Sequence, residues 1–440
     1  MSSISPVNDN RVSGGSGSRL DRWFRGQVCR RIDRLQTGTL VIIDADGRQQ
    51  FGTGQSPRAE IVVSDQRFWR FVATGGGVGA GEAFMAGWWS ADELTTALRV
   101  LAANRSALEA IDGGGARIMG RLLAVWHAFN RNTLKGSQRN ISAHYDLGNA
   151  FFRTWLDEQM QYSSALYQHP DETLEQAQHN KLDRLCQKLD LQPGMHLLEI
   201  GTGWGGLAIH AARHYGCRVT TTTISRRQFD YAADRIKDEG LNDLVELRLD
   251  DYRHLTGRYD RVVSVEMVEA VGHQYLDTYL GKIDALLKPG GLAMVQAITI
   301  EDHRYRRALK NVDFIKRYVF PGSFIPSVSA IAASMGRSTR LGLIELFDMG
   351  SSYCRTLADW RERFLAAWPE IRAMGFDETF RRRWLFYLAY CEAGFAERAI
   401  SNVQLLFAGP DYRNSDHRDF DQRNRGKSLD NASHRLQGEP

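Results

Sequence analysis

The feature that most constrains the fold is an apolar segment that runs into a glycine-rich turn at residues 195–206 (MHLLEIGTGWGG). A helical pattern leaves this turn through Leu207, Ala208 and Ile209. Glycines let the backbone adopt positive φ and approach a ligand closely, and the start of the next helix offers free N–H groups. Glu199, directly before the turn, is an acid that can receive a hydroxyl or an ammonium group. A lone Gly-x-Gly-x-Gly also occurs in strand-to-helix turns that bind no ligand, so the sequence downstream is needed to distinguish a ligand site from such a turn.

The sequence after this turn alternates between strand and helix patterns. Strands are predicted at 195–200, 217–224, 244–249, 260–266 and 292–300, and helices at 173–189, 205–215, 226–238 and 275–287. Pro289-Gly290-Gly291 is expected to stop the last helix, and a region rich in helix and aromatic residues is expected at 357–407. Strands that alternate with crossover helices predict an α/β fold with a doubly wound parallel sheet, covered on both faces.

Composition excludes several classes of protein. The 43% hydrophobic and 25% charged content is typical of a soluble globular protein, and the net charge of +4 gives no support for a nucleic-acid partner. The five cysteines are scattered without a Cys-x-x-Cys, which argues against a disulfide framework or a zinc site and favours a reducing cytoplasm. No run of about 18 apolar residues is present, so any membrane contact is expected to be peripheral.

We divide the 440 residues into a disordered start (1–18), a smaller α+β N-terminal domain (19–130), a second domain (140–412) and a disordered tail (413–440), with a polar linker at 131–139. In the N-terminal domain, 40–43 and 59–63 are predicted strands, and helices are expected at 94–108 and 118–129. The glycine run at 75–81 lacks the Gly-Lys-Ser/Thr of a phosphate loop. The aromatic patch at 84–89 is assigned to the core, with a lipid-facing surface as the alternative.

The residues at the carboxyl ends of the predicted strands indicate a cofactor. Ligands of such sheets bind beyond these ends, near the switch in strand order. An NAD site has Gly-x-Gly-x-x-Gly and an acid about 20 residues further on. Here the second strand ends in Thr223 and Ser225, and Asp251 with Tyr252 follows the third, suited to the edge and the face of an adenine. The layout fits an adenosyl group without a pyrophosphate, so S-adenosylmethionine is preferred over NAD.

Six segments, in order, resemble the cyclopropane fatty acid synthases. They are 144–149 (HYDLGN), 162–165 (YSSA), 172–178 (ETLEQAQ), 198–206 (LEIGTGWGG), 223–225 (TIS) and 320–327 (FPGSFIPS). That family comprises S-adenosylmethionine-dependent methyltransferases that act on unsaturated acyl chains of phospholipids, and it includes enzymes that leave methyl branches. The resemblance covers about 140–408 and extends more weakly to 81–89. It implies a Rossmann-like class I methyltransferase sheet with helical lipid-binding additions, preceded by a lipid-associating N-terminal domain.

The resemblance also implies a set of cofactor contacts, for each of which ordinary turn or packing chemistry is the alternative. They are Tyr162 and Ser163 over the methionine part, Glu199, Gly201, Gly203 and Trp204 beneath it, Thr223, Ile224 and Gln228 at the ribose, and Asp251 with Tyr252 at the adenine.

In this family, methyl transfer to a double bond leaves a carbocation in an apolar tunnel that excludes water. In the ring-forming members a bound bicarbonate then removes a proton from the new methyl group. The catalytic residues that the resemblance implies here are Glu269, Tyr387, Gln296, Ser164 and Ile298. Gln296 and Ser164 depart from the family's His and Cys, and Ala270 replaces a second His. Bicarbonate as the bound base therefore stays open, as does the product: cyclopropane, methyl-branched alkene or methylene.

The sequence is compatible with three functions. The first is methyl transfer to unsaturated phospholipid acyl chains by a cytoplasmic enzyme that docks on the inner face of the membrane, through basic clusters such as 304–307 and the Arg-aromatic stretch 314–320. The second is a methyltransferase for a small soluble acceptor, and the third is a catalytically silent cofactor- or lipid-binding relative. A homodimer is expected only by analogy with dimeric relatives.

Overall fold

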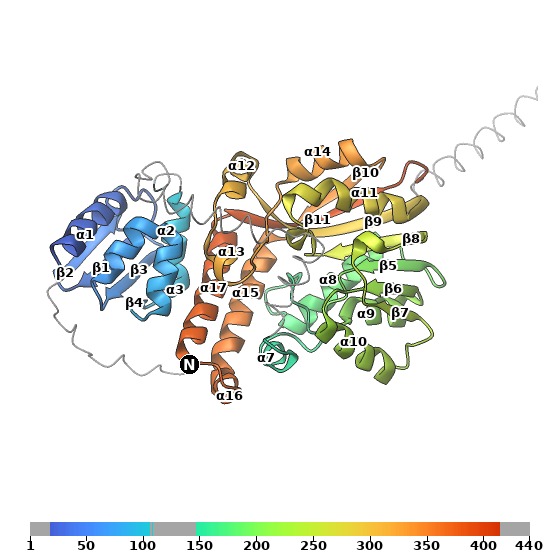
Figure 1. Cartoon of the computed structure of the whole chain (residues 1–440), viewed down its shortest axis with the longest axis horizontal. Helices are drawn as coiled ribbons and strands as arrows, with labels where there is room; N and C mark the ends of the chain where they lie inside the picture. Colours follow the sequence, from blue (N-terminus) through green and yellow to red (C-terminus); the bar gives the residue numbers. More distant parts are fainter. Residues whose placement is uncertain (1–17, 106–107, 109–146, 414–440) are drawn as a thin grey trace, which may run out of the picture.

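The computed structural model describes residues 18–105, 108 and 147–413 (Figure 1). The helix predicted at 118–129, the linker at 131–139 and nearly all of the two terminal segments lie outside the described residues. So do residues 144–146 of the first family segment.

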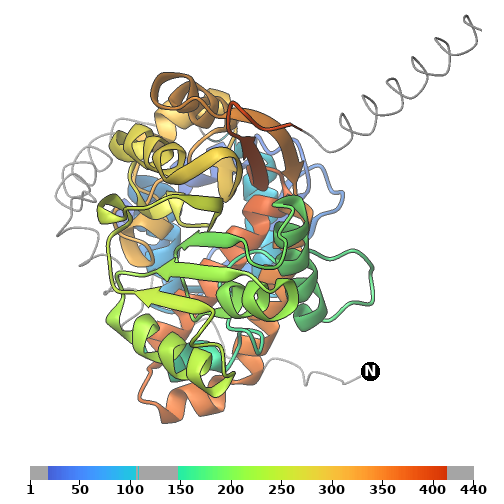
Figure 2. The ribbon, with the colours of Figure 1, turned by 90° about the vertical axis from the view of Figure 1, so that its right-hand side faces the viewer.

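A seven-stranded sheet with the order β10-β11-β9-β8-β5-β6-β7 forms the centre of the larger part of the chain (Figure 2). Its parallel strands are β5 (His196–Ile200), β6 (Arg218–Thr222), β7 (Val245–Arg248), β8 (Tyr259–Val265) and β9 (Leu287–Ile300). The crossover helices are α9 (Gly206–Tyr215), α10 (Arg226–Asp238) and α11 (Leu276–Leu286), and α8 (Leu174–Lys188) precedes β5. These elements confirm the predicted alternation. Because β5 pairs with β6 on one side and β8 on the other, the strand order switches beside the glycine-rich turn.

Two further strands are antiparallel, and the sequence did not predict them. β11 (Ile400–Ala408) lies between β9 and the edge strand β10 (Gly342–Asp348). The prediction of a helix-rich region up to residue 407 is therefore wrong at its end, where a mostly buried strand of apolar and amide side chains pairs with β9. The predicted end of the helix before Pro289-Gly290-Gly291 is confirmed, because α11 ends at Leu286, but these three residues already belong to β9, which begins at Leu287 rather than at the predicted residue 292.

Helices added to this sheet carry many of the aromatic residues. They are α7 (Asn149–Arg153), α12 (Asp302–Lys310), α13 (Phe314–Tyr318), α14 (Val328–Ser338), α15 (Gly350–Ala366), α16 (Trp368–Ala373) and α17 (Glu378–Ala396). Short 3-10 turns follow β7 and β8, namely η1 (Tyr252–His254), η2 (Val268–Ala270) and η3 (His273–Tyr275). Helix α17 lies between the N-terminal elements and the seven-stranded sheet (Figure 1). No helix in the described ranges is both long and apolar enough to cross a bilayer.

The N-terminal elements form a four-stranded sheet of order β2-β1-β3-β4 with three helices. They are α1 (Arg19–Ile32), β1 (Thr39–Asp44), β2 (Gly47–Gly52), β3 (Arg58–Val63), α2 (Arg67–Met85), β4 (Trp89–Ala91) and α3 (Leu94–Ala103). The two predicted strands are confirmed. β2 escaped prediction because only Phe51 in it is buried. The glycine run is helical, with a kink at Gly76, where φ is +54°.

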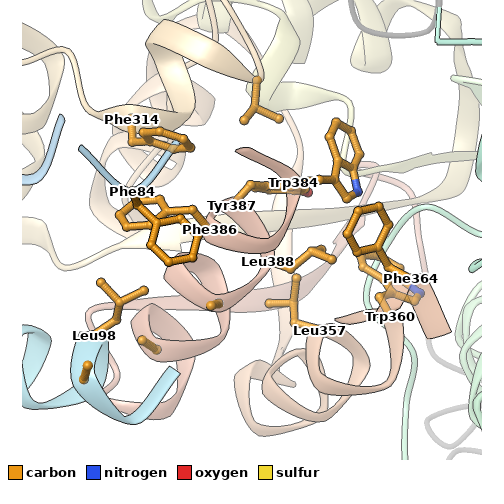
Figure 3. Close-up of a cluster of buried hydrophobic side chains, with 14 of the residues drawn as sticks. Phe84, Leu98, Phe314, Leu357, Trp360, Phe364, Trp384, Phe386, Tyr387 and Leu388 are labelled. Atoms are coloured by element: carbon orange, nitrogen blue, oxygen red, sulfur yellow. The ribbon is translucent and has the colours of Figure 1, made fainter. Parts of the chain in front are cut away.

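One hydrophobic core joins the N-terminal sheet to α15 and α17 (Figure 3). Phe386 of α17 packs on Phe84 of α2 and on Phe314 of α13, with ring centroids 5.7 and 4.6 Å apart. Gly81 permits this approach, because a Cβ there would lie 2.4 Å from the Phe314 ring. The assignment of the aromatic patch to the core is confirmed for Phe84 and Trp89. The domain limits themselves stay a prediction.

Candidate active site

A cavity of about 870 Å³ lies beyond the carboxyl ends of β5, β6 and β8 and extends to the N-terminal helices. The predicted site residues that line it are Tyr162, Ser163, Glu199, Gly201, Gly203, Trp204, Thr223, Ile224, Gln228, Asp251, Tyr252, Glu269, Ile298 and Tyr387. Two predicted residues, Ser164 and Gln296, are fully buried and do not line it. The strands thus bring together residues that are far apart in the sequence.

The turn after β5 forms the floor of one end of the cavity. Gly201 and Gly203 have φ of +105° and +54°, a conformation that favours glycine. Glu199, at the end of β5, accepts a hydrogen bond from Thr221 Oγ1 at 2.6 Å. Burial raises the pKa of Glu199 to about 8. This carboxyl group is therefore poised to ionise when a cationic group binds beside it.

The residues predicted for the ribose and the adenine are held by their neighbours. Thr223 Oγ1 donates to Gln228 Oε1 at 2.9 Å, which fixes the side-chain amide of Gln228 at the cavity wall. Asp251 accepts two hydrogen bonds from the Arg253 guanidinium, at 2.8 and 2.7 Å. Burial works to raise the pKa of Asp251, but the bonds from Arg253 outweigh it and lower the pKa. Asp251 is therefore a carboxylate, with lone pairs left to accept from an amino group.

Tyr162 and Ser163, predicted to close over the methionine part, line the cavity. Tyr162 Oη lies 2.9 Å from Tyr387 Oη, which connects this segment to α17. Ser163 Oγ accepts from Lys181 Nζ at 2.9 Å. Lys181 is fully buried in α8, and burial lowers its pKa to about 8. Lys181 was not predicted as a site residue, although a lysine on the apolar face of a predicted helix is a usable signal.

This set of residues fits S-adenosylmethionine. The cavity wall offers a buried acid where the methionine end is predicted, an amide and a hydroxyl where the ribose is predicted, and a carboxylate next to an aromatic residue where the adenine is predicted. When bound, that cofactor supplies an electrophilic methyl group. Among the described residues, no group of His, Cys, Asp and Glu side chains is arranged to hold a metal ion.

Glu266, directly after β8, is the polar centre of the other end; its place at the end of a predicted strand was recognised, but no catalytic role was predicted for it. Its Oε1 accepts from Ser164 N (2.9 Å), Gln296 Nε2 (2.9 Å) and Asn402 Nδ2 (2.7 Å), while Oε2 accepts from Tyr353 Oη (2.8 Å). Ser164 and Gln296 thus contact a carboxylate of the chain itself. A charged residue at the end of a mostly buried strand is the sequence signal that could have revealed this role.

The direction of the Gln296 amide is set by a chain of hydrogen bonds across three strands. Arg184 Nε donates to Gln404 Oε1 at 2.9 Å, Gln404 Nε2 donates to Gln296 Oε1 at 3.0 Å, and Gln296 Nε2 then faces Glu266. Because the guanidinium can only donate, both amides are oriented with their N–H groups toward the carboxylate.

Glu269 lies one turn further on, in η2. Its Oε1 accepts from Ile298 N at 2.6 Å, while its Oε2 is buried without a hydrogen-bond partner. Burial raises the pKa of Glu269 to about 8, and the nearby charge of Glu266 adds to the rise. At neutral pH Glu269 is therefore mostly protonated, whereas the hydrogen bonds donated to Glu266 favour its carboxylate.

The sheet order, the glycine turn and these contacts define a class I S-adenosylmethionine-dependent methyltransferase. The family model described as mycolic acid cyclopropane synthetase matches residues 132–405. The chain belongs to this family.

Relatives along most of the chain agree with this assignment. The tuberculostearic acid methyltransferase UfaA1 of Mycobacterium tuberculosis is 40% identical over 351 residues, covering 78% of this chain and 81% of the relative. The cyclopropane-fatty-acyl-phospholipid synthase of Escherichia coli is 39% identical over 360 residues, covering 81% and 89%. The solved structure of mycolic acid cyclopropane synthase CmaA1 with SAH and CTAB has a TM-score of 0.58 at 28% identity, covering 62% of this chain and 98% of that one.

Proposed function

We propose that this enzyme transfers a methyl group from S-adenosylmethionine to the double bond of an unsaturated phospholipid acyl chain, giving a cyclopropane or a methyl-branched chain. The observation that carries the proposal is the continuity of the cavity. One space joins the cofactor residues, the Glu266–Glu269 pair and an apolar end formed by the N-terminal helices. Apolar side chains at that end include Val28, Ile32, Leu98 and Leu101.

An apolar cavity suits the chemistry as well as the substrate. A carbocation on an acyl chain reacts with any water that reaches it, and an apolar cavity lining keeps water away from it. Tyr387 and Phe320, whose ring centroids are 6.1 Å apart, both line the cavity and can present aromatic faces to a cation. Both products stay in the proposal, because the two relatives named for different products are almost equally similar, at 40% and 39% identity.

We further propose that the enzyme docks on an anionic membrane surface. Helix α12 carries His303, Arg304, Arg306, Arg307 and Lys310, none of them buried, and Arg304 and Arg307 also line the cavity. On α1, Leu20 and Trp23 are exposed to 51% and 57%. Basic side chains attract anionic lipids, and exposed apolar groups enter the interface. A cytoplasmic enzyme on the inner face of the membrane is the setting that this surface supports.

A homodimer is the assembly that we propose. The edge strand β10 exposes Leu343, Ile344 and Leu346, and an exposed apolar edge is a usual site for pairing with a second copy. Analytical ultracentrifugation of the wild type and of Ile344→Lys tests this. A wild-type protein that is monomeric at all concentrations contradicts it.

The enzymatic proposal is tested by mass spectrometry of fatty acid methyl esters. Protein is incubated with S-adenosylmethionine and vesicles of unsaturated phospholipid, with saturated vesicles as the control. We expect a gain of one CH2 unit on unsaturated chains only. Mild hydrogenation then separates the products, because a methyl-branched alkene takes up hydrogen and a cyclopropane resists.

The two other functions predict different results in the same assay. Turnover of a soluble amine or phenol, with none on any unsaturated lipid, indicates a small-molecule methyltransferase. Cofactor binding without turnover of either class indicates a silent relative.

A further inference from the structure

We propose that Glu266 is the built-in proton acceptor of the reaction, so that turnover needs no dissolved anion such as bicarbonate. This rests on the proposed function, because the proton comes from the methylated acyl chain. Glu266 borders the cavity together with Glu269 and Tyr387. Glu266 is therefore on the wall of the cavity that the acyl chain would enter under the proposed function.

The contacts of Glu266 keep it ionised. The three groups that bond to its Oε1 are a backbone N–H and two side-chain amides, and each donates. A protonated Oε1 would oppose all three, so the hydrogen bonds favour the anion. An anion that is held in place before the reaction stabilises a cation that develops beside it, because no free energy is spent on reorienting the surrounding groups.

The carboxylate is nevertheless able to take up a proton. Its Oε2 accepts a single hydrogen bond, from Tyr353, which leaves a lone pair for a proton. Burial raises the pKa of Glu266 above its usual value in spite of the four hydrogen bonds. Glu269 is a poorer acceptor, because burial and the charge of Glu266 already keep it protonated at neutral pH.

The step balances without an oxidant or a reductant. After the alkene has gained the methyl group, the chain carries one positive charge. The C–H bond that breaks leaves its electron pair in the chain, where it becomes the third bond of a ring or a new C=C bond. The proton goes to Glu266, whose carboxylate becomes a carboxylic acid and later returns the proton to solvent.

The backbone at Glu266 offers a clean test. Its φ of +48° is one that side chains rarely adopt and that glycine adopts freely. Glu266→Gly therefore suits the backbone and leaves the four donors around a vacancy of carboxylate size. Formate or bicarbonate can fill this vacancy. Glu266→Gln keeps the shape and removes the charge, and Glu158→Gln, at an exposed position, is the matched control.

Turnover is measured on unsaturated vesicles in bicarbonate-depleted buffer, with and without added formate or bicarbonate. We expect the wild type and Glu158→Gln to be independent of both anions. Glu266→Gln and Glu266→Gly should lose about 10²–10⁴-fold in kcat, the range typical of a missing general base, with affinity for S-adenosylmethionine retained. Formate should restore Glu266→Gly by at least about ten-fold and leave Glu266→Gln unchanged.

A thermal-shift measurement separates this proposal from the proposed function. Formate should raise the Tm of Glu266→Gly but not of the wild type, because only the variant has four unpaired donors. A wild type that stops without bicarbonate, or a Glu266→Gly variant as active as the wild type without added anion, overturns the proposal. If the wild type methylates no lipid, the proposed function fails. In that case the Tm measurement with formate is the only test of the anion site. A Tm shift confined to Glu266→Gly supports the site, and the absence of a shift overturns the proposal.

Discussion

The carboxyl group of Glu269 is buried with only one of its oxygens hydrogen-bonded, and its pKa is raised from 4.5 to about 8. The native state therefore holds this proton more tightly than the unfolded state does. It follows that the contribution of Glu269 to the free energy of unfolding falls as pH rises from about 4.5 to 8 and is constant above that window.

Glu269→Gln should remove this pH dependence, because the amide mimics the protonated acid without titrating. We expect the variant to be close to the wild type near pH 5 and more stable above pH 8, by roughly 2–4 kcal/mol. Urea unfolding at both pH values measures the difference, with the exposed Glu158→Gln as control. An equal difference at both pH values contradicts the raised pKa.

Glu199 gives a second prediction at the scale of one residue. With a pKa of about 8, it is mostly protonated at pH 7, and a bound ammonium group favours its carboxylate. Binding of S-adenosylmethionine at pH 7 should therefore release up to about one proton. Calorimetry in buffers of different ionisation enthalpy measures the release. Glu199→Gln should release none; release unchanged in this variant means that another group titrates.

At the scale of secondary-structure elements, the fit of α2 against α13 and α17 depends on one small residue. Gly81 is buried, and a Cβ there would lie 2.4 and 2.5 Å from ring atoms of Phe314 and 3.0 Å from Phe386. These rings are part of the core that joins the N-terminal sheet to the methyltransferase helices (Figure 3). The helix therefore has little room for any side chain at this position.

Gly81→Val should force the helices apart and destabilise the protein by about 1–3 kcal/mol. The matched control is Gly26→Ala in α1, where a Cβ meets nothing within 4 Å. Because Gly is a poor helix former, the control should be neutral or stabilising by up to about 1 kcal/mol. Thermal unfolding measures both variants. A Gly81→Val protein as stable as the control would show that α2 can move away from α13 and α17 at little cost in free energy.

At the scale of the whole molecule, the proposed membrane surface combines α12 and the exposed start of α1. Reversing two charges, in Arg306→Glu/Lys310→Glu, should weaken binding to anionic vesicles by about ten-fold or more, since each basic residue near the surface contributes about 1 kcal/mol. Vesicle cosedimentation measures this. Arg218→Glu is the control, because that exposed residue begins β6, at the opposite end of the strand from the cavity. Equal loss in both proteins would contradict a localised docking surface.

Local sequence patterns determined much of this protein. The spacing of apolar residues and the positions of turn residues predicted the parallel strands and crossover helices. A buried strand and the amphipathic helix that covers it differ in how their apolar residues are spaced. The resemblance to the cyclopropane fatty acid synthases placed the cofactor residues from Tyr162 to Tyr252 on matching segments, and the structure lines one cavity with them. Most of these residues could be predicted because they lie at or after the end of a strand in a recognisable motif, whereas Tyr162 and Ser163 precede α8 and were predicted from the resemblance alone.

Only the tertiary structure decided what surrounds Glu266. Its four donors come from a loop before α8, from β9, from α15 and from β11, and β11 was itself missed. Nothing local to Tyr353 or Asn402 indicates that its polar group faces a carboxylate, because hydrogen bonds across so many residues arise from strand register and helix packing. The register of β11 on β9, with Asn402 opposite Ile298 and Gln404 opposite Gln296, is what aims these amides at the site.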